Sequence, residues 1–428
     1  MQGLLLIPDE RCFIEVAKHP LLHRVLLTGQ RAGVHDWLIV ARHEAHRLQV
    51  SLAAAPKLAG ISWQVFDLQS TSPGVLAPAL QSATVLVFSG TVVYDRRPLV
   101  QLQRGDGTSV CVTTSPLAKT DPMSEGVALQ NGSIAALIPT GQSTWYTTDM
   151  LRCPGELLSR ILPEVWNKLQ SSSTPVAVIL HALMQVTTVK ALDISQHAWV
   201  PLTAPLERSV ATAEAHLIRG LGRDGDSPLV RLIDRRISQA ITKRLVHTTI
   251  TPNQITLVSA GIGLSGALLL AHPSRLWQVL GSLLFLLSTI IDGCDGEIAR
   301  LTFQESEFGA KLDVIMDNVV HIFLFSCIAL GLYRQEQHTL YLLLGGLTLG
   351  GVLLSMALYL PYLWHARVAR QTVMRLHEVL ASRDFAYLLP VFALLHLLHW
   401  FLWAATIGTY LFALALGGIY LYRLRHPS

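Results

Sequence analysis

The chain has 428 residues, of which 51% are hydrophobic and 14% are charged, and its formal net charge is +4. Soluble domains carry about 25% charged residues, so this composition excludes a wholly soluble protein and predicts that part of the chain lies in lipid. The small net charge gives no support for a nucleic-acid partner, and the length predicts two or more domains.

The five cysteines are scattered along the chain without a C-x-x-C pair. They predict neither a disulfide framework nor a zinc site, and they fit a reducing cytosol. At the N-terminus, Asp9 and Glu10 interrupt the first apolar run, and no basic segment precedes it. We therefore expect no signal peptide there.

Up to about residue 205, short runs typical of β-strands alternate with amphipathic stretches. The strand-like runs are LLLI, WLIVAR, WQVFDL, TVLVFSG and VAVIL, and clusters such as SSSTP separate them. Strands that alternate with helices are typical of parallel α/β layers. We therefore predict a cytosolic α/β domain over residues 1–205.

A basic amphipathic helix is predicted from Ser227 to Val246, within a connecting segment over residues 206–248. Ser227 and Pro228 form a typical helix start. Apolar residues follow at every fourth position: Leu229, Ile233, Ile237, Ile241 and Leu245. Basic residues cover the other face: Arg231, Arg235, Arg236, Lys243 and Arg244. Such helices lie in membrane interfaces, and the alternative is a solvated helix packed on a domain.

Six hydrophobic spans follow, and together they predict an all-α transmembrane bundle over residues 249–428. Their approximate bounds are 253–271, 275–292, 312–333, 339–363, 386–402 and 404–422. Each is close to the ~20 residues that a helix needs to cross the hydrocarbon core.

The distribution of basic residues predicts how the spans are oriented. One set of loops and termini carries most of them, including Arg300, Lys311, Arg367, Arg370, Arg375, Arg383, Arg423 and Arg425. The opposite loops carry only Arg275 and Arg334. By the positive-inside rule, both termini and the loop over residues 293–311 face the cytosol.

The stretch IDGCDGEIARLTFQESEFGAKLDVIMDN, residues 291–318, places a cluster of carboxylates between two apolar spans. Asp292 and Asp295 share one helix face, and Asp313 and Asp317 share a face on the next helix. Four carboxylates brought together would repel one another unless a divalent cation offset their charge. Oxygen ligands favour Mg²⁺, Mn²⁺ or Ca²⁺ over zinc.

Neighbouring residues suit a phosphate ligand beside that cation. Gly296 and Gly309 remove side chains next to the cluster and allow close approach, and Arg300 supplies a bidentate donor for phosphate. Glu305 and Glu307 have no helical register to the aspartates, and we interpret them as solvated loop charges.

The spacing Asp292-x₂-Asp295-Gly296-x₂-Ala299-Arg300-x₈-Gly309-x₃-Asp313-x₃-Asp317 resembles the signature of the CDP-alcohol phosphotransferase (CDP-alcohol phosphatidyltransferase) family of membrane enzymes without a gap or substitution. The segment TITPNQIT, residues 249–256, resembles the approach to that family's first span. The resemblance covers about residues 214–422.

The resemblance implies a transferase of phospholipid-type biosynthesis that takes a CDP-alcohol or CDP-diacylglycerol donor, releases CMP, and joins the phosphoryl-alcohol group to an acceptor hydroxyl. It implies one or two Mg²⁺ or Mn²⁺ ions held by Asp292, Asp295 and Asp313, with Asp317 as a further ligand or as the base that takes the acceptor proton. It implies substrate contacts by Asn253, Gly296, Ala299, Arg300 and Gly309. Lys311 lies inside the motif and is a candidate for an acceptor phosphate.

The N-terminal half resembles a nucleotidyltransferase that has lost its catalytic residues. The resemblance rests on HPLLHRVLLTGQRAGVHDWLIVA (19–41), TVLVFSGTVVYD (84–95) and HAWVPLTAPLERSVATAEAHLIRGL (197–221). PDERCF replaces the glycine-rich phosphate loop, and the two metal aspartates read Ser89-Gly90-Thr91 and Pro201. The order of domains resembles bifunctional inositol-phosphate cytidylyltransferase/di-myo-inositol-phosphate synthases, yet we expect a scaffolding or regulatory domain. A still active cytidylyltransferase, with Asp95 as substitute ligand, is the alternative.

Several alternatives stay open at this point. A cation transporter would also place carboxylates in a membrane, and CMP binding would distinguish it from a transferase. The donor can be CDP-diacylglycerol, CDP-archaeol or a soluble CDP-polyol, and the acceptor an inositol phosphate, a glycerol phosphate, another polyol or a lipid. His396 and His399, one turn apart in the fifth span, suit helix packing, whereas His321 suits packing or substrate equally. Membrane lipids are expected partners, and a homodimer is an open alternative.

Overall fold

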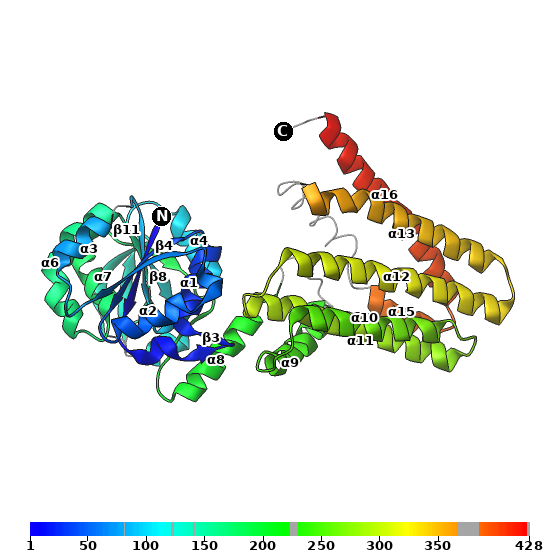
Figure 1. The fold of residues 1–428 in the computed structure, drawn as a ribbon, viewed down its shortest axis with the longest axis horizontal. Coiled ribbons are helices and arrows are strands. Elements are labelled where there is room, and N and C mark those ends of the chain that lie inside the picture. The colour runs from blue at the N-terminus through cyan, green and yellow to red at the C-terminus, as the bar shows by residue number, and fades with distance from the viewer. Residues whose placement is uncertain (81, 121–123, 140–141, 223–229, 366–384, 426–428) are drawn as a thin grey trace. The chain divides into compact units, whose positions relative to one another are not determined.

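The computed structural model describes residues 1–428 except 81, 121–123, 140–141, 223–229, 366–384 and 426–428. The side chains of residues 120, 231, 359–365 and 419–425 are also outside the description. The chain divides into two compact units, Met1–Gly220 and Leu221–Ser428. The first is α/β and the second is helical, which confirms the predicted fold class (Figure 1).

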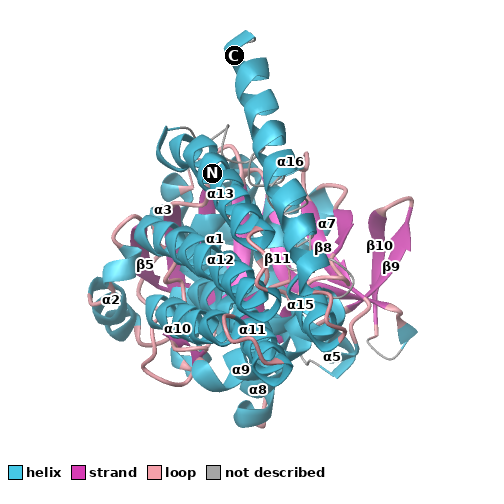
Figure 2. Cartoon of the chain, turned by 90° about the vertical axis from the view of Figure 1, so that its right-hand side faces the viewer, coloured by secondary structure: helices cyan, strands magenta, loops and turns pink. Residues whose placement is uncertain are grey.

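The first unit is built on a nine-stranded mixed sheet with the order β5-β4-β1-β6-β11-β8-β12-β10-β9. Its strands are β1 Gln2–Ile7, β4 Asp36–Ala41, β5 Ser62–Asp67, β6 Val85–Ser89, β8 Ser109–Thr113, β9 Gly126–Gln130, β10 Ser133–Ile138, β11 Trp145–Cys153 and β12 Lys190–Asp193. Two small ribbons pair β2 Glu15–Val16 with β3 His19–Pro20, and β7 Val92–Tyr94 with β13 Trp199–Pro201. Figure 2 shows β5 and the β9–β10 hairpin at opposite ends of the large sheet.

The prediction of a parallel sheet is correct for only one part of it. Strands β5, β4, β1 and β6 run parallel, but β11 is antiparallel to both of its neighbours β6 and β8. The hairpin β9–β10 is antiparallel as well. Local runs of apolar residues identify strands without fixing their direction, because direction depends on how distant segments connect.

The helices of the first unit cover both faces of the sheet. They are α1 Leu21–Arg31, α2 Ala45–Ala53, α3 Pro73–Leu76, α4 Arg96–Arg104, α5 Pro116–Thr120, α6 Gly155–Ser171, α7 Pro175–Val186 and α8 Leu206–Arg219. In Figure 1, α3, α6 and α7 lie on one side of the sheet, and α1 and α4 lie on the other. Helix α8 packs against β2 and β13, so the compact division falls after Gly220 rather than after residue 205.

The run VAVIL, interpreted above as a strand, is part of helix α7. Its buried residues Val176, Ile179, Leu180 and Leu183 recur with helical spacing. Pro175 occupies the first turn, where its missing N–H costs nothing. Burial of this face against the sheet overrides the strand preference of the β-branched residues.

The second unit consists of long apolar helices. They are α9 Arg235–Leu245, α10 Pro252–Leu270, α11 Arg275–Leu301, α12 Glu307–Glu336, α13 Leu340–His365, α15 Phe385–Leu394 and α16 Leu398–Arg425. Within the described part of the chain, five of them are long and apolar enough to cross a membrane: α10, α11, α12, α13 and α16. The second unit is therefore a membrane-embedded region.

The sequence predicts six spans, but in the described part of the chain five helices are long enough to cross a membrane, and two boundaries differ from those predicted. The fifth span, predicted over 386–402, is interrupted: α15 ends at Leu394, α16 begins at Leu398, and His396 between them has a φ of 59°. His396 and His399 therefore do not lie on one continuous helix. The loop predicted over 293–311 is much shorter, because α11 continues to Leu301 and Ser306 caps the start of α12. Apolar residues on both sides of a break hide it from hydropathy.

Helices α10 and α11 approach closely along a seam of small residues. A methyl group on Gly266 would lie 2.7 Å from the carbonyl oxygen of Gly281 and 2.9 Å from the amide nitrogen of Phe285. The two backbones are thus in contact at this point. This contact fixes how α10 faces α11, and it brings polar residues of α10 next to the aspartates described below.

Candidate metal and phosphate site

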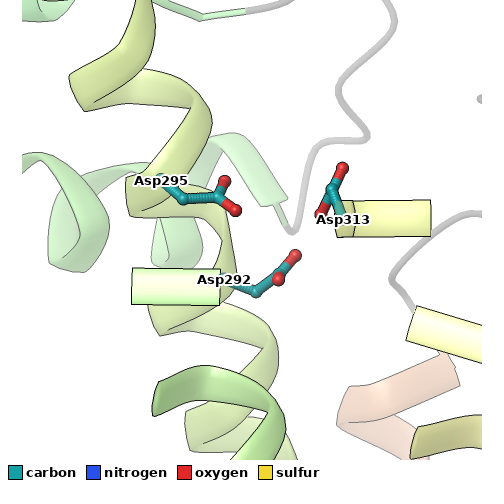
Figure 3. Close-up of side chains that lie close together, drawn as sticks. All are labelled: Asp292, Asp295 and Asp313. Carbon is teal, nitrogen blue, oxygen red and sulfur yellow. The ribbon is translucent and has the colours of Figure 1, made fainter. Parts of the chain in front are cut away.

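Three aspartates converge where the last turns of α11 meet the second turn of α12. Asp292 and Asp295 extend from α11 toward Asp313 of α12 (Figure 3). One carboxylate oxygen from each lies within 4.8 Å of the others. Asp292 is 8% exposed and Asp295 is 9% exposed. The predicted convergence of these three residues is present in the fold.

Helix α10 supplies hydroxyl donors to both aspartates of α11, and the sequence did not predict these donors. Thr256 Oγ1 donates to Asp295 Oδ2 at 2.5 Å, and Ser259 Oγ is 3.3 Å from Asp292 Oδ1. The backbone N–H of Gly296 also donates to Asp295. A polar residue recurs at every third position in the first half of α10: Asn253, Thr256 and Ser259. This spacing could have indicated a polar helix face toward the aspartates.

The start of α10 is specified by its sequence. Thr251 caps the helix by accepting from the N–H of Gln254, whose side chain accepts in turn from the N–H of Thr251 at 2.9 Å. Pro252 fills the first helical position. This reciprocal cap fixes the register of α10, and with it the turn on which Asn253 and Thr256 lie.

The start of α12 brings Asn253 and Gly309 together. Ser306 Oγ accepts from the N–H of Gly309 at 2.9 Å and ends the short loop that follows α11. A methyl group on Gly309 would lie 3.0 Å from Asn253 Oδ1. The absent side chain therefore leaves room for Asn253 at the edge of the cluster, as the sequence predicted for that glycine.

Arg300 extends back along α11 over Gly296. A methyl group on Gly296 would lie 3.0 Å from Arg300 Nη1, so the guanidinium covers the bare backbone of that turn. Ala299 is half-buried beside it, and Lys311 is half-buried on α12 between Gly309 and Asp313. On α11, Arg300 and Ala299 thus lie about one turn beyond Asp295. On α12, Lys311 and Gly309 lie within about one turn before Asp313.

Asp317 lies one turn beyond Asp313 on α12 and is half-buried. The carboxylate group whose oxygens lie within 4.8 Å of one another contains Asp292, Asp295 and Asp313, not Asp317. The fold thus gathers three of the four predicted aspartates at one point. Asp317 is offset from them along the helix.

The donor set fits a hard divalent cation. All three converging groups are carboxylates, and Mg²⁺ and Mn²⁺ prefer oxygen ligands. Three negative charges this close, two of them on buried side chains, repel one another in the absence of a compensating charge. A divalent ion held by these three carboxylates would remove that repulsion.

The remaining candidates from the sequence are two histidines of the helical bundle and a group of arginines. His321 stacks among Phe285, Phe325 and Phe385, with ring centroids 5.6–6.2 Å away, which is a packing role. His399 contacts the ring of Trp400 in α16. The arginines at 367, 370, 375 and 383 lie outside the described residues, as does Leu229.

In the first unit, the segment that replaces the expected phosphate loop is closed by its own side chains. Asp9 caps the short turn η1 Glu10–Phe13 and binds the Arg11 guanidinium at 2.6–2.9 Å. Arg11 Nη1 donates to the carbonyl oxygen of Leu202 at 2.6 Å, and Cys12 is fully buried. The backbone N–H groups therefore do not form an open cradle here.

The positions of the two expected metal aspartates are also filled. Ser89 Oγ and Thr91 Oγ1 lie 2.9 Å apart and are fully buried. The N–H of Gly90 donates to the carbonyl oxygen of Leu6, which joins the ends of β6 and β1. Pro201 pairs with Val92 in the β7–β13 ribbon. Asp95 caps α4 by accepting from the N–H of Arg97 at 3.3 Å.

Comparisons with known proteins place these features in context. Residues 249–417 match the CDP-alcohol phosphatidyltransferase family. The chain is similar to the "Bifunctional IPC transferase and DIPP synthase" of Aquifex aeolicus, with 31% identity over 141 residues, which is 33% of this chain and 31% of the relative. It is also similar to the "Phosphatidylinositol phosphate synthase" of Corynebacterium glutamicum, with 37% identity over 93 residues, which is 22% of this chain and 41% of the relative.

Each match therefore spans well under two thirds of the relative's length. A likeness to the solved structure of the inositol-1-phosphate CTP transferase from T. maritima covers 50% of this chain and 96% of that chain, with a TM-score of 0.39 and 11% identity.

Proposed function

With residues 249–417 matching the CDP-alcohol phosphatidyltransferase family, we propose that the second unit transfers a phosphoryl-alcohol group from a CDP-alcohol to an acceptor hydroxyl and releases CMP. The observation that carries the proposal is the convergence of Asp292, Asp295 and Asp313 within 4.8 Å from two successive helices. Arg300 beside Gly296 supplies the cationic side that a diphosphate needs.

Asp292, Asp295 and Asp313 are the residues that would hold Mg²⁺ or Mn²⁺. When bound, such an ion offsets the charge of the diphosphate and makes its phosphorus more electrophilic. Thr256 and Ser259 orient two of the three carboxylates from α10, which is the usual task of groups behind metal ligands.

The reaction breaks one bond and forms one. The bond between the alcohol-bearing phosphorus and the bridging oxygen breaks, and CMP leaves with that oxygen. The acceptor oxygen forms the new bond to the same phosphorus, and its proton passes to Asp317. The offset of Asp317 from the three converging aspartates supports this role, because a base must reach the acceptor rather than the leaving group.

The acceptor that we propose is a phosphorylated polyol. Lys311 lies between Gly309 and Asp313 on α12, where its ammonium group can neutralise a second phosphate near the base. The names of the relatives in Aquifex aeolicus and Corynebacterium glutamicum are consistent with acceptors of this class. The asymmetry of basic residues supports a site that faces the cytosol.

The first unit, on this proposal, does not make the CDP-alcohol. Two features support this: the Asp9 carboxylate is engaged by the Arg11 guanidinium, and the buried positions 89 and 91 carry hydroxyls in place of carboxylates. Its role is then to support or regulate the second unit.

The test is a product assay on the full-length protein in lipid nanodiscs. Labelled CDP-diacylglycerol and a soluble CDP-polyol are each supplied with Mg²⁺ and with glycerol phosphate, inositol phosphate or inositol. CMP and a labelled phosphodiester should appear together with one donor and a phosphorylated acceptor, and EDTA should abolish both. Glu307→Gln, a change of an exposed carboxylate at the start of α12, is the matched control. Absence of CMP binding and release with every donor would favour the transporter alternative.

A further inference from the structure

The amphipathic helix α9 is held on α11 by a polar face, together with the C-terminal part of the apolar face that its sequence indicated. The buried residues of α9 are Ser238 and Thr242, whereas Ile237 is 40% exposed, and Ile233, in the π-helical turn Val230–Asp234 that precedes α9, is 36% exposed. Further along, Ile241 and Leu245 pack against Cys294 and Ile298 of α11. Part of the apolar stripe is thus available to lipid, while the small polar residues face the bundle.

The polar face of α9 surrounds a single carboxylate, that of Glu297. This side chain is 0% exposed although it lies two residues beyond Asp295. Arg235 Nη1 and Ser238 Oγ each donate to its Oε1 at 2.8 Å, and Thr242 Oγ1 donates to its Oε2 at 2.8 Å. Three donors from three successive turns of α9 thus converge on one residue of the metal-binding helix.

The N-terminal end of α9 is attached to a second helix. Asp234, 5% exposed, accepts a hydrogen bond from the Tyr387 hydroxyl of α15. Cys294 of α11 lies beneath α9, with its Sγ 3.6 Å from the carbonyl oxygen of Ser238. The helix is therefore fixed at adjacent positions to two different helices of the bundle.

Burying the Glu297 carboxylate carries a desolvation penalty, which its hydrogen-bond partners on α9 offset. Residues two apart on a helix point in nearly opposite directions, so α9 grips the side of α11 that faces away from Asp295. The same turn carries Gly296 and is followed by Arg300. Any shift of this turn changes the separation between Asp295 and Asp313.

We propose that Glu297 is a positioning residue: through Arg235, Ser238 and Thr242 it fixes α9 against α11 and so fixes the aspartates of α11 opposite Asp313. The catalytic consequence rests on the proposed function, whereas the docking of α9 and the affinity of the site for a divalent ion do not. The experiment therefore measures all three on the same full-length protein.

Cys294 provides a direct probe of the docking. In nanodiscs, its alkylation by N-ethylmaleimide is followed by mass spectrometry, with the buried Cys327 of α12 as an internal reference. Glu297→Gln removes the charge but keeps the shape, and it should raise the alkylation rate of Cys294 at least about tenfold, because labelling of a buried group follows local opening. Thr242→Val removes one donor and should give a smaller rise. Glu307→Gln should leave the rate unchanged.

Mn²⁺ binding, measured by electron paramagnetic resonance of the free ion, probes the positioning. Glu297→Gln should weaken Mn²⁺ binding by roughly 10–100-fold, the range typical for groups that orient metal ligands. The ratio kcat/KM for the donor should fall with it, and excess Mn²⁺ should restore part of the loss. Thr242→Val keeps the carboxylate and serves as the variant to interpret if Glu297→Gln does not fold.

The combined results distinguish whether Glu297 holds α9 and whether it positions the aspartates. Unchanged alkylation of Cys294 in both variants would show that Glu297 does not hold α9. Faster alkylation with unchanged Mn²⁺ affinity would reduce Glu297 to a structural role and overturn the proposal. Faster alkylation with weakened Mn²⁺ binding supports it, even in a protein that releases no CMP, in which case only the proposed function fails.

Discussion

Two regions of this chain, the junction of α11 and α12 and the ends of β1 and β6, differ in what their side chains do. At the junction of α11 and α12, three carboxylates point toward one another in a membrane-embedded unit. At the ends of β1 and β6, the corresponding positions hold Ser89 and Thr91, whose buried hydroxyls are within hydrogen-bonding distance of each other. The first region brings like charges together, whereas the second places neutral hydroxyls at these two positions.

The difference is whether the protein itself offsets the charged and polar groups of each region. Buried carboxylates destabilise a protein unless a cation or a set of donors offsets their charge, so their presence argues for a ligand. Paired hydroxyls and a closed salt bridge such as Arg11–Asp9 satisfy themselves and need none. The converging aspartates therefore call for a ligand, whereas the hydroxyl pair and the salt bridge do not.

The strongest test of this contrast is the removal of a converging carboxylate. Asp313→Asn should abolish CMP release to the level of a protein-free control, because α12 then contributes no charged ligand to the three-oxygen group. Radiolabelled CDP-alcohol turnover measures it, with Glu307→Gln as the matched change. Full turnover of Asp313→Asn, or of the native protein in excess EDTA, would rule out the two-helix metal site.

Asp317→Asn sharpens the contrast within the second unit by separating chemistry from binding. Asparagine keeps the shape but cannot take a proton at neutral pH, so turnover should fall by roughly 10²–10⁴. Mn²⁺ and CDP-alcohol should still bind almost normally, because Asp317 is outside the converging group. Collapse of both affinities together with the rate would instead make Asp317 a metal ligand.

Thr256→Val tests whether α10 contributes to the metal site. It removes the hydroxyl that donates to Asp295 at 2.5 Å and keeps the side-chain volume, so Mn²⁺ affinity should fall by roughly 10–100-fold. Thr289→Val on α11 is the control, since that hydroxyl donates to the carbonyl oxygen of Phe285 in its own helix. Equal Mn²⁺ affinities for the two variants would contradict a role for Thr256.

The smallest effect is expected in the first unit. Full-length protein supplied with CTP and a phosphorylated alcohol should release no pyrophosphate above a protein-free control. Asp95→Ala should leave CMP release unchanged and lower the stability of this unit by about 1 kcal/mol, the usual cost of losing a helix cap. Pyrophosphate release that disappears in Asp95→Ala would show that Asp95 replaces the missing metal ligands.

The sequence located the aspartates well because their spacing is a local property of two helices. Asp292 and Asp295 are three residues apart on α11. A short loop leads from α11 to α12, so two adjacent helices bring Asp313 close to both of them. The signature also indicated Gly296 and Gly309. Their missing side chains leave room for Arg300 and for Asn253, respectively.

The sequence did not indicate the partners that come from other helices. Thr256 and Ser259 look like ordinary polar residues until α10 is packed on α11. Glu297 looks like one more charge of the acidic stretch, although it faces away from the metal group and binds α9. In the first unit, the strand direction of β11 and the helix at Val176–Leu180 depend on tertiary packing, which overrides local preference.

The most direct test of the account counts Mn²⁺ ions bound and CMP molecules released by one preparation of the full-length protein in nanodiscs. We expect one or two tightly bound ions per chain, CMP release that rises with their occupancy, and loss of both in Asp313→Asn. CMP release that proceeds at the native rate without bound Mn²⁺ or Mg²⁺ would contradict it. Tight Mn²⁺ binding that survives in Asp313→Asn would contradict it equally.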